Sequence, residues 1–398
     1  MMSACARSAV TVPQPGCLRV SLMKSFPQER HQKVGKLPAN KGPGEDMSVE
    51  PAIPQHLRRP RTRPSRMPAG FEAPYPAWMA RFDEGAAPLV MAYFGVQHSG
   101  SLPPGALAPI KAMLPAHPAA RHWIEAQCRD GANYDTRIII AYWQDAKTFA
   151  AWREASGFDG WWSDPARETE SVGRFMEVVA PPMERLEVAY SPPDLPQGAG
   201  NLQSRVSACP VAEHAYWGSA RDRIPASQTD PLENDAGTLA LIRNGARLRV
   251  EPGRNVCMIR SGQDWSDTRG EERATYLGRV RPKLIDGMRY LRDEGLPIGC
   301  FSCRFMQVLD GSGAAVEKTF GQAYFRSLGA LEQWAEHHPT HLAIFGTFMH
   351  EMAPLGDAMQ LRLWHEVMVL PAEAQSFEYV NCHDRTGLLR AAGSREAL

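Results

Sequence analysis

The chain has 398 residues, of which 43% are hydrophobic and 22% charged, and its 44 Lys and Arg residues equal its 44 Asp and Glu residues. This composition is typical of a globular protein with room for two domain-sized cores. A formal net charge of zero argues against a general nucleic-acid binder, and no apolar run of about 18 residues supports a transmembrane helix. Eight scattered cysteines fit free thiols in a reducing compartment, so we expect a cytoplasmic protein whose partner is a small molecule.

Residues 1–46 form a basic head that is rich in Pro and Gly, with seven Lys and Arg residues against one acidic residue in the first 44 positions. We expect a disordered extension, arising from an upstream start codon or a tail, with Met47 opening the functional protein. A transit peptide is the alternative, whereas a secretory signal is not expected because the head lacks a continuous apolar segment. The basic, proline-broken character continues to Arg63, so ordered structure should begin near residues 71–79.

An internal repeat organises the rest of the chain. The matched segments are 141–152 with 323–334 at an offset of 182, 90–97 with 256–263, and 174–178 with 363–367. The first pair predicts a strand end, a turn and an amphipathic helix, and the other two predict strands. Each half then has the order β, helix, β, β, helix, β. In the second half, the long helix falls at 270–292 and a hairpin turn at 310–313.

This element order is that of the ferredoxin-like split βαβ unit. Two tandem units would pack sheet against sheet with helices outside, so the predicted fold class is α+β, a pseudo-twofold α+β barrel of the dimeric α-β barrel type. We expect residues 47–190 to form the first half with an N-terminal lead-in, and residues 256–398 to form the second half. Residues 191–255 are predicted to connect the halves, with a short helix near residues 213–223.

Histidines gather in the second half, where His337, His338 and His341 lie within five residues and His365 follows 24 residues after His341. Strand alternation places His365 on one face with Leu361, Leu363, Val367 and Val369. Such a histidine is either a satisfied core residue or a working group, and both interpretations stay open. The first half has Ser156, Asp159 and Met176 at the positions that match His338, His341 and His365. This asymmetry favours one functional site, in the second half.

The surroundings of this cluster favour haem over zinc. No Asp, Glu or Cys ligand set accompanies His338 and His341 at the usual zinc spacing. A haem needs only one axial histidine and an apolar pocket. Apolar surface is available near the cluster from Phe320, Tyr324, Phe325, Leu342, Ile344, Phe345 and Phe348. An aromatic stripe is by default simply core, so this observation does not decide the question by itself.

Five segments, in order along the chain, resemble the haem-containing aldoxime dehydratases, also called phenylacetaldoxime dehydratases. They are Tyr216–Arg223 (YWGSARDR), Ile259–Trp265 (IRSGQDW), His338–His341 (HPTH), Leu363–Val367 (LWHEV) and Tyr379–His383 (YVNCH). The resemblance runs from about Met47 to about Leu389. It implies a haem-dependent lyase that converts aldoximes, R-CH=N-OH, into nitriles and water, with the oxime nitrogen bound to ferrous haem. The haem should be non-covalent haem b, since the chain lacks a CxxCH motif.

The resemblance also assigns roles to individual residues. It makes His341 the proximal haem ligand and His365 the distal general acid. It points to Ser261 as the distal serine and to Arg223, with Arg221 as the fallback, as the distal arginine. A catalytic glutamate matches Glu187 less securely, because the sequence around it has drifted.

Alternatives remain at each of these positions. His338 is the next candidate for the ligand, followed by His337 and His383. Arg223 could instead form a structural salt bridge with Asp222 or Asp230, and Ser261 could bond to the backbone. The competing functions are a haem peroxidase or chlorite-dismutase-like enzyme, and a haem carrier or sensor without turnover. The sequence leaves open the choice between aryl-alkyl and aliphatic oximes, and also the oligomeric state, with a homodimer as one option.

Overall fold

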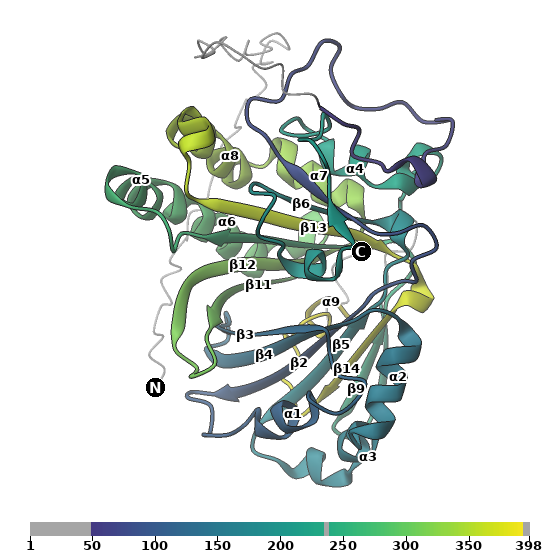
Figure 1. Ribbon diagram of the computed structural model, residues 1–398. Helices are drawn as coiled ribbons and strands as arrows, with labels where there is room; N and C mark the ends of the chain where they lie inside the picture. Colours follow the sequence, from purple (N-terminus) through teal and green to yellow (C-terminus); the bar gives the residue numbers. More distant parts are fainter. Residues whose placement is uncertain (1–48, 235–238, 393–398) are drawn as a thin grey trace, which may run out of the picture. The chain divides into compact units, whose positions relative to one another are not determined.

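Strands dominate the computed structural model, which describes residues 49–234 and 239–392 (Figure 1). The predicted basic head at 1–46 lies outside the described residues. Fourteen strands in the described ranges form one antiparallel sheet, in the order β7-β1-β6-β13-β10-β12-β11-β3-β4-β2-β5-β14-β9-β8. They are β1 Trp78–Arg81, β2 Val90–Ser99, β3 His122–Arg129, β4 Tyr134–Trp143, β5 Gly173–Val179, β6 Leu186–Tyr190, β7 Arg205–Val206, β8 Ala240–Asn244, β9 Arg247–Glu251, β10 Val256–Asp264, β11 Cys300–Leu309, β12 Ala315–Phe325, β13 Arg362–Leu370 and β14 Gln375–Val380. The predicted α+β class is therefore confirmed, and the strands form one large antiparallel sheet.

The helices are α1 Ala108–Met113, α2 Ala146–Ala155, α3 Phe158–Ser163, α4 Ser219–Arg223, α5 Gly270–Thr275, α6 Arg281–Glu294, α7 Leu328–His337, α8 Pro339–Glu351 and α9 Leu389–Ala392. All of them except α9 lie outside the sheet, whereas Leu389 of α9 packs in the apolar core between the strands. Figure 1 shows α1–α3 on one side of the strands and α4–α8 on the other. None of the helices in the part of the chain that the structure describes is long and apolar enough to span a membrane.

Two groups of four strands form the middle of the sheet. The group β13-β10-β12-β11 and the group β3-β4-β2-β5 meet where residues 307–309 of β11 pair with residues 125–127 of β3. The next strand along the chain after each group pairs with the other group. β6 comes after β5 in the chain and pairs with β13, and β14 comes after β13 and pairs with β5. The hydrogen-bonded order of the described strands has two ends, at β7 and β8.

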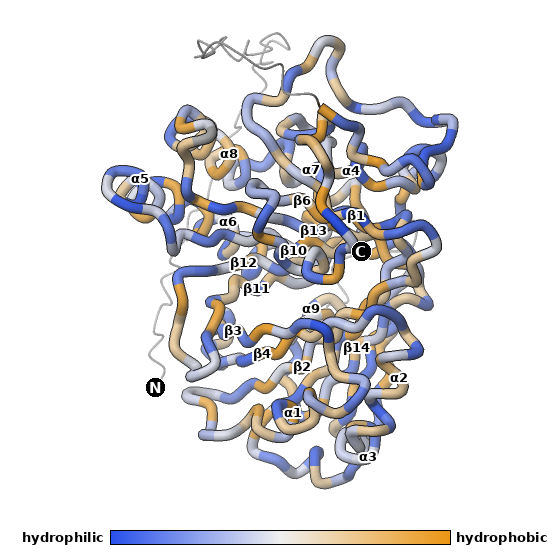
Figure 2. The backbone as a smooth tube through the Cα atoms, in the orientation of Figure 1, coloured by the Kyte–Doolittle hydropathy of each residue, from blue (hydrophilic) through white to orange (hydrophobic). Residues whose placement is uncertain are grey.

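Three apolar clusters hold these layers together. One lies between the two strand groups and joins Tyr93 and Ile140 to Met258 and Tyr324. A second lies under α1–α3, and a third lies under α6 and α7 around Trp334. Figure 2 shows the hydrophobic residues concentrated along the strands, with hydrophilic residues frequent in the peripheral loops. The burial of apolar surface on both faces is the main term that stabilises such a layered fold.

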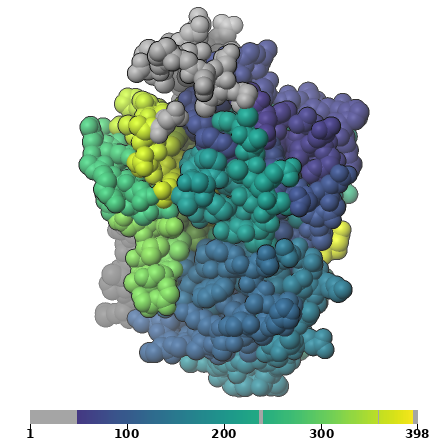
Figure 3. Space-filling model, in the orientation of Figure 1, coloured from purple at the N-terminus to yellow at the C-terminus, as the bar shows by residue number. Residues whose placement is uncertain are grey.

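Several local predictions can be compared with the observed elements. The long helix expected at 270–292 is present, but it contains a π-helical turn at Tyr276–Val280 and ends at Glu294. The hairpin expected at 310–313 joins β11 to β12. The segment 191–255 contains α4 where a short helix was expected, and it also contains β7, β8 and β9. The N-terminal lead-in comprises the described residues before β2, 49–89. Figure 3 shows this lead-in, in purple, beside the teal segment 191–255.

Candidate active site

A cavity of about 340 Å³ lies between the strand group β13-β10-β12-β11 and the helices next to it. Its walls come from β10 and β13, from α6–α8, from residues 75–77 of the lead-in, and from residues 214–220 and Arg223 around α4. Four of the predicted site residues line this one cavity: Ser261, Arg223, His341 and His365. The fifth, Glu187, lies directly behind it and contacts Arg223 and His365.

The start of α8 positions His341. His338 caps this helix, since its side chain accepts a hydrogen bond from Thr340 N, and Pro339 occupies the first helical turn, where its missing N–H costs nothing. His341 then lies within the first turn, and its Nδ1 donates to the carbonyl oxygen of Ala335 at 2.7 Å. Nε2 has no hydrogen-bond partner among the described residues. Burial lowers the pKa of His341, opposed by the backbone hydrogen bond, so the ring is neutral near pH 7.

The surroundings of His341 fit a haem. A neutral imidazole with Nδ1–H held by a carbonyl and a free Nε2 is the form that binds a metal ion. Its ring packs 4.6 Å from Trp334 and 5.8 Å from Trp217, which in turn packs 4.8 Å from Phe345. Ile344 adds further apolar surface. The residues present therefore match a single axial ligand in an apolar pocket.

The alternative ligands lie elsewhere. The Nδ1 of His338 lies 2.9 Å from the hydroxyl of Thr340, and its ring stacks on Tyr290 at 4.0 Å. His383 lies 2.7 Å from Asp130. Neither histidine lines the cavity, and His337 does not either.

The predicted distal residues Arg223, His365 and Glu187 contact one another. The Nη2 of Arg223 lies 2.6 Å from Nε2 of His365, and Nε and Nη2 of Arg223 donate to Glu187 at 3.0 and 3.2 Å. The Nε2 of His365 also lies 3.1 Å from Oε1 of Glu187. Strand pairing explains the meeting, because Glu187 on β6 is two residues from Ala189, the direct neighbour of His365 on β13. Ser261 on β10 is the direct neighbour of His365 on the opposite side.

Electrostatics keeps Glu187 ionised although it is fully buried. Burial alone would raise the pKa of its carboxyl, but the charge of Arg223 and the hydrogen bonds from His365 and Arg223 outweigh burial and lower the pKa to about 2. Arg223 is only 2% exposed. Its salt-bridge partner is thus Glu187, whereas Asp222 is bound by Ser65 and Tyr216 and Asp230 by Arg185.

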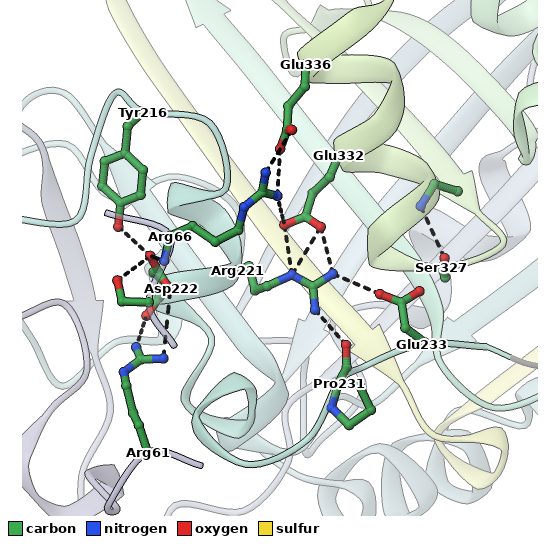
Figure 4. A network of polar contacts seen from close by, with 12 residues as sticks. Arg61, Arg66, Tyr216, Arg221, Asp222, Pro231, Glu233, Ser327, Glu332 and Glu336 are labelled. Carbon is green, nitrogen blue, oxygen red and sulfur yellow. Dashed lines mark hydrogen bonds and ion pairs between the residues drawn. The ribbon is translucent and has the colours of Figure 1, made fainter. Parts of the chain in front are cut away.

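Arg221 has a different set of partners. Figure 4 shows it between two carboxylates, and its Nη2 lies 2.7 Å from Glu332 on α7 and 3.0 Å from Glu233. Nearby, Arg66 of the lead-in lies 2.6 Å from Glu336, also on α7. Arg221 does not line the cavity. Of the two arginines that the sequence leaves as candidates, only Arg223 contacts His365.

His214 was missed in the sequence analysis. It lines the same cavity, its Nε2 is buried without a hydrogen-bond partner among the described residues, and its ring lies edge-on to Tyr75 at 4.7 Å. Burial, and then the charges of Arg223 and His365, lower its pKa well below the usual value. A signal was available, because His214 stands two residues before the YWGSARDR segment. The next residue, Ala215, has a φ of 61°, a left-handed conformation that is uncommon for alanine and often marks functional sites.

Comparison with known proteins places this arrangement in a family. Residues 92–388 match the family of haem-containing dehydratases. The aliphatic aldoxime dehydratase of Pseudomonas chlororaphis is 40% identical over 86% of this chain and 99% of its own length. The phenylacetaldoxime dehydratase of Bacillus sp. (strain OxB-1) is 33% identical over 81% of this chain and 93% of its own.

A solved structure supports the same assignment. The crystal structure of an aldoxime dehydratase in complex with butyraldoxime is similar with a TM-score of 0.82 at 37% identity, covering 86% of this chain and 96% of that one. Its fold and that of this protein therefore agree over most of their lengths. Since the family match spans most of the chain, this protein belongs to the haem-containing dehydratase family.

Proposed function

We propose that this protein is a haem-dependent lyase that dehydrates aldoximes to nitriles and water. One observation supports this function above all: a neutral His341 with a free Nε2 lines the same cavity as Ser261 and a His365 held by Arg223 and Glu187. This is the residue set for one metal ligand and one proton donor. The names of relatives that are 33% to 40% identical point to the same reaction.

His341 would hold the haem, and the absence of a CxxCH motif makes that haem non-covalent haem b. When bound in the ferrous state, the haem supplies a coordination position for the oxime nitrogen and electron density that weakens the N–O bond. Ala335 fixes the tautomer of His341, and Trp217, Trp334 and Phe345 exclude water from the proximal side.

The distal residues handle the protons. Hydroxide is a poor leaving group, so His365 donates a proton from Nδ1 to the oxime oxygen, and the oxygen departs as water. Glu187 stabilises the protonated ring by accepting a hydrogen bond from Nε2. His365 then recovers a proton as the C–H proton of the substrate is lost, which leaves R-C≡N. Ser261 and an N–H of Arg223 that is not bonded to Glu187 or Glu213 hold the oxime oxygen.

We propose that residues 47–190 and 256–398 are two tandem ferredoxin-like units joined by 191–255, related by a pseudo-twofold axis in an α+β barrel. The support is the strand order of the two groups, β13-β10-β12-β11 and β5-β2-β4-β3. In both groups the fourth strand along the chain comes first in the sheet, followed by the first, third and second strands. The reciprocal addition of β6 and β14 is what a twofold relation would produce.

Butyraldoxime turnover by the His365→Ala holoenzyme tests the function. We expect haem content and oxime binding at ferrous iron to be kept, and turnover to fall by roughly 10²- to 10⁴-fold, the usual contribution of a positioned acid. The spectrum of the oxime-bound ferrous enzyme should therefore persist. Ser261→Ala should lose less, and His383→Ala, remote from the cavity, serves as the matched control. Nitrile formation near the parental rate by His365→Ala would contradict the assignment.

A further inference from the structure

A second cavity of about 340 Å³ lies on the other face of the strands that carry the distal residues. On β10 and β13, Arg260 and Glu366 are direct neighbours, one position along from the pair of Ser261 and His365. Successive side chains of a strand point to opposite faces. Ser261 and His365 thus face the helices, and Arg260 and Glu366 face the space between the two strand groups.

Arg260 is fully buried, and only part of its guanidinium has partners. Its Nη1 donates to Glu366 at 2.9 Å and to the hydroxyl of Tyr142. The guanidinium carbon lies 4.5 Å from the ring centre of Phe320 and 5.0 Å from that of Trp364, so aromatic rings pack close to the group. Both Nε and Nη2 are buried without a hydrogen-bond partner among the described residues.

The two unpartnered nitrogens belong to one edge of the guanidinium. Nε–H and Nη2–H point in parallel and match the two oxygens of a carboxylate, the geometry that makes arginine a bidentate ligand for planar anions. Leaving these donors without acceptors is costly in a buried site. Glu366 does not bond to these two nitrogens. One of its oxygens accepts from Nη1 of Arg260, and the other accepts from Ala199 N at 2.8 Å.

The walls of this cavity suit a small polar ligand. Besides Arg260, its hydrogen-bonding residues include His122, Asn201, Gln263 and Thr319. Its other charged groups, Lys318 and Asp264, neutralise each other at 3.0 Å. The cavity shares only Gln263 and Trp364 with the candidate active site, so it is a separate space. The apolar residues Ile124 and Val308 provide surface for a short hydrocarbon chain.

We propose that this cavity is a second ligand site that binds a small carboxylate, whose two oxygens accept hydrogen bonds from Nε and Nη2 of Arg260. The positive charge of Arg260 acts inside the cavity. Burial is the main cause that lowers the pKa of His122, and the charge of Arg260 is the second cause. The carboxylate would complete the hydrogen bonding of a fully buried cation, and its alkyl chain would lie against Ile124 and Val308. The site does not depend on the proposed reaction.

Calorimetric titration of the ferrous, CO-bound holoenzyme with sodium propionate at constant ionic strength tests this site. Carbon monoxide blocks the iron, so binding there cannot be mistaken for binding at Arg260. We expect saturable binding of propionate at millimolar concentration, and at least about tenfold weaker binding of the neutral isostere propionamide. Arg260→Lys keeps a charge but loses the paired donors and should weaken propionate binding by at least about tenfold.

Arg260→Lys alters the buried ion pair with Glu366 and could weaken binding by misfolding, so a second variant leaves this pair intact. Val308→Trp fills the cavity while Arg260, Glu366 and Tyr142 keep their contacts, and it should abolish propionate binding. His365→Ala, on the other face of the sheet, should bind propionate like the parent. Equal binding of propionamide, absence of propionate binding, or binding that neither Arg260→Lys nor Val308→Trp weakens would each overturn the proposal.

Discussion

The Nη2 of Arg223 lies 2.6 Å from Nε2 of His365, and Glu187 closes the triangle at 3.1 Å from the same nitrogen. These two neighbours carry opposite charges. The guanidinium is permanently charged, and the buried carboxylate is kept ionised by Arg223 and His365. Glu187 is the acceptor for the Nε2–H of His365, which makes Glu187 as important as the histidine itself.

Replacement of Glu187 by Gln should therefore impair proton transfer and not haem binding. The amide keeps the size of the side chain and removes its charge, so Arg223 alone acts on the protonated ring. We expect kcat to fall, because the protonated ring loses its charged acceptor, with KM and haem content little changed. Glu336→Gln, which contacts Arg66 outside the distal triangle, is the matched control. An unchanged kcat in Glu187→Gln would remove the carboxylate from the proton path.

The two arginines of α4 should respond differently to the same substitution. Arg223 donates three hydrogen bonds to Glu187 and Glu213 and also contacts His365, and a lysine ammonium cannot reproduce this fork. Arg223→Lys should lose most of the turnover. Arg221→Lys breaks the paired contact with Glu332 and should lower the melting temperature while turnover stays near the parental value. Steady-state assays and thermal unfolding of both variants check this, and the reverse pattern would make Arg221 the distal arginine.

His341→Ala should lose haem without unfolding. The ring supplies the nitrogen proposed to bind the iron, and its contacts among the described residues include Trp334, Trp217 and Ala335. The haem-to-protein absorbance ratio after gel filtration measures retention, and far-ultraviolet circular dichroism reports the fold. His338→Ala is the control and should keep its haem, because His338 serves as a helix cap. Full haem occupancy in His341→Ala would transfer the ligand role to another residue.

How far the sequence could lead depends on whether the information is local. The alternation around His365 correctly placed it on one face with Leu363 and Val367, since period-two patterning is a property of the strand itself. The choice between Arg221 and Arg223 was not local, because it depends on how α4 meets β6 and β13. The charged cluster likewise depends on the pairing of β6 with β13, which brings Glu187 close to His365, 178 positions later in the chain.

Other misses had a local signal that was not used. Asn244-Gly245 stands between alternating residues, which is a strong hairpin signal, and β8 and β9 form that hairpin. The helix α8 begins with His338 as the cap and Pro339 in the first turn. A reading that treats 191–255 only as a connection overlooks that β9 pairs with β14 and extends the sheet.

Acid should destabilise the fold in two separate pH ranges. His214 has a lowered pKa because of burial, so only the unfolded chain binds its proton, and stability falls as the pH drops through the ordinary value of 6.5. Glu187 has a pKa lowered from 4.5 to about 2 in the fold, so its contribution is present above about 4.5 and is lost as the pH falls toward 2. Urea unfolding of the parent, His214→Phe and Glu187→Gln from pH 7.5 to 3 measures both terms. We expect His214→Phe to flatten the upper range and Glu187→Gln the lower range. Parallel curves for all three proteins would contradict this assignment.

Removal of residues 1–46 should leave haem content and turnover unchanged, because the described residues that line the cavity begin at Tyr75. Removal of residues 1–76 should abolish both. That deletion takes away Tyr75, which lines the cavity, and Ser65 and Arg66, which bond to Asp222. Haem absorbance and nitrile formation by the two truncated proteins make the comparison. Loss of haem in the shorter deletion would show that the head belongs to the folded unit, and retention in the longer one would show that the lead-in is dispensable for the site.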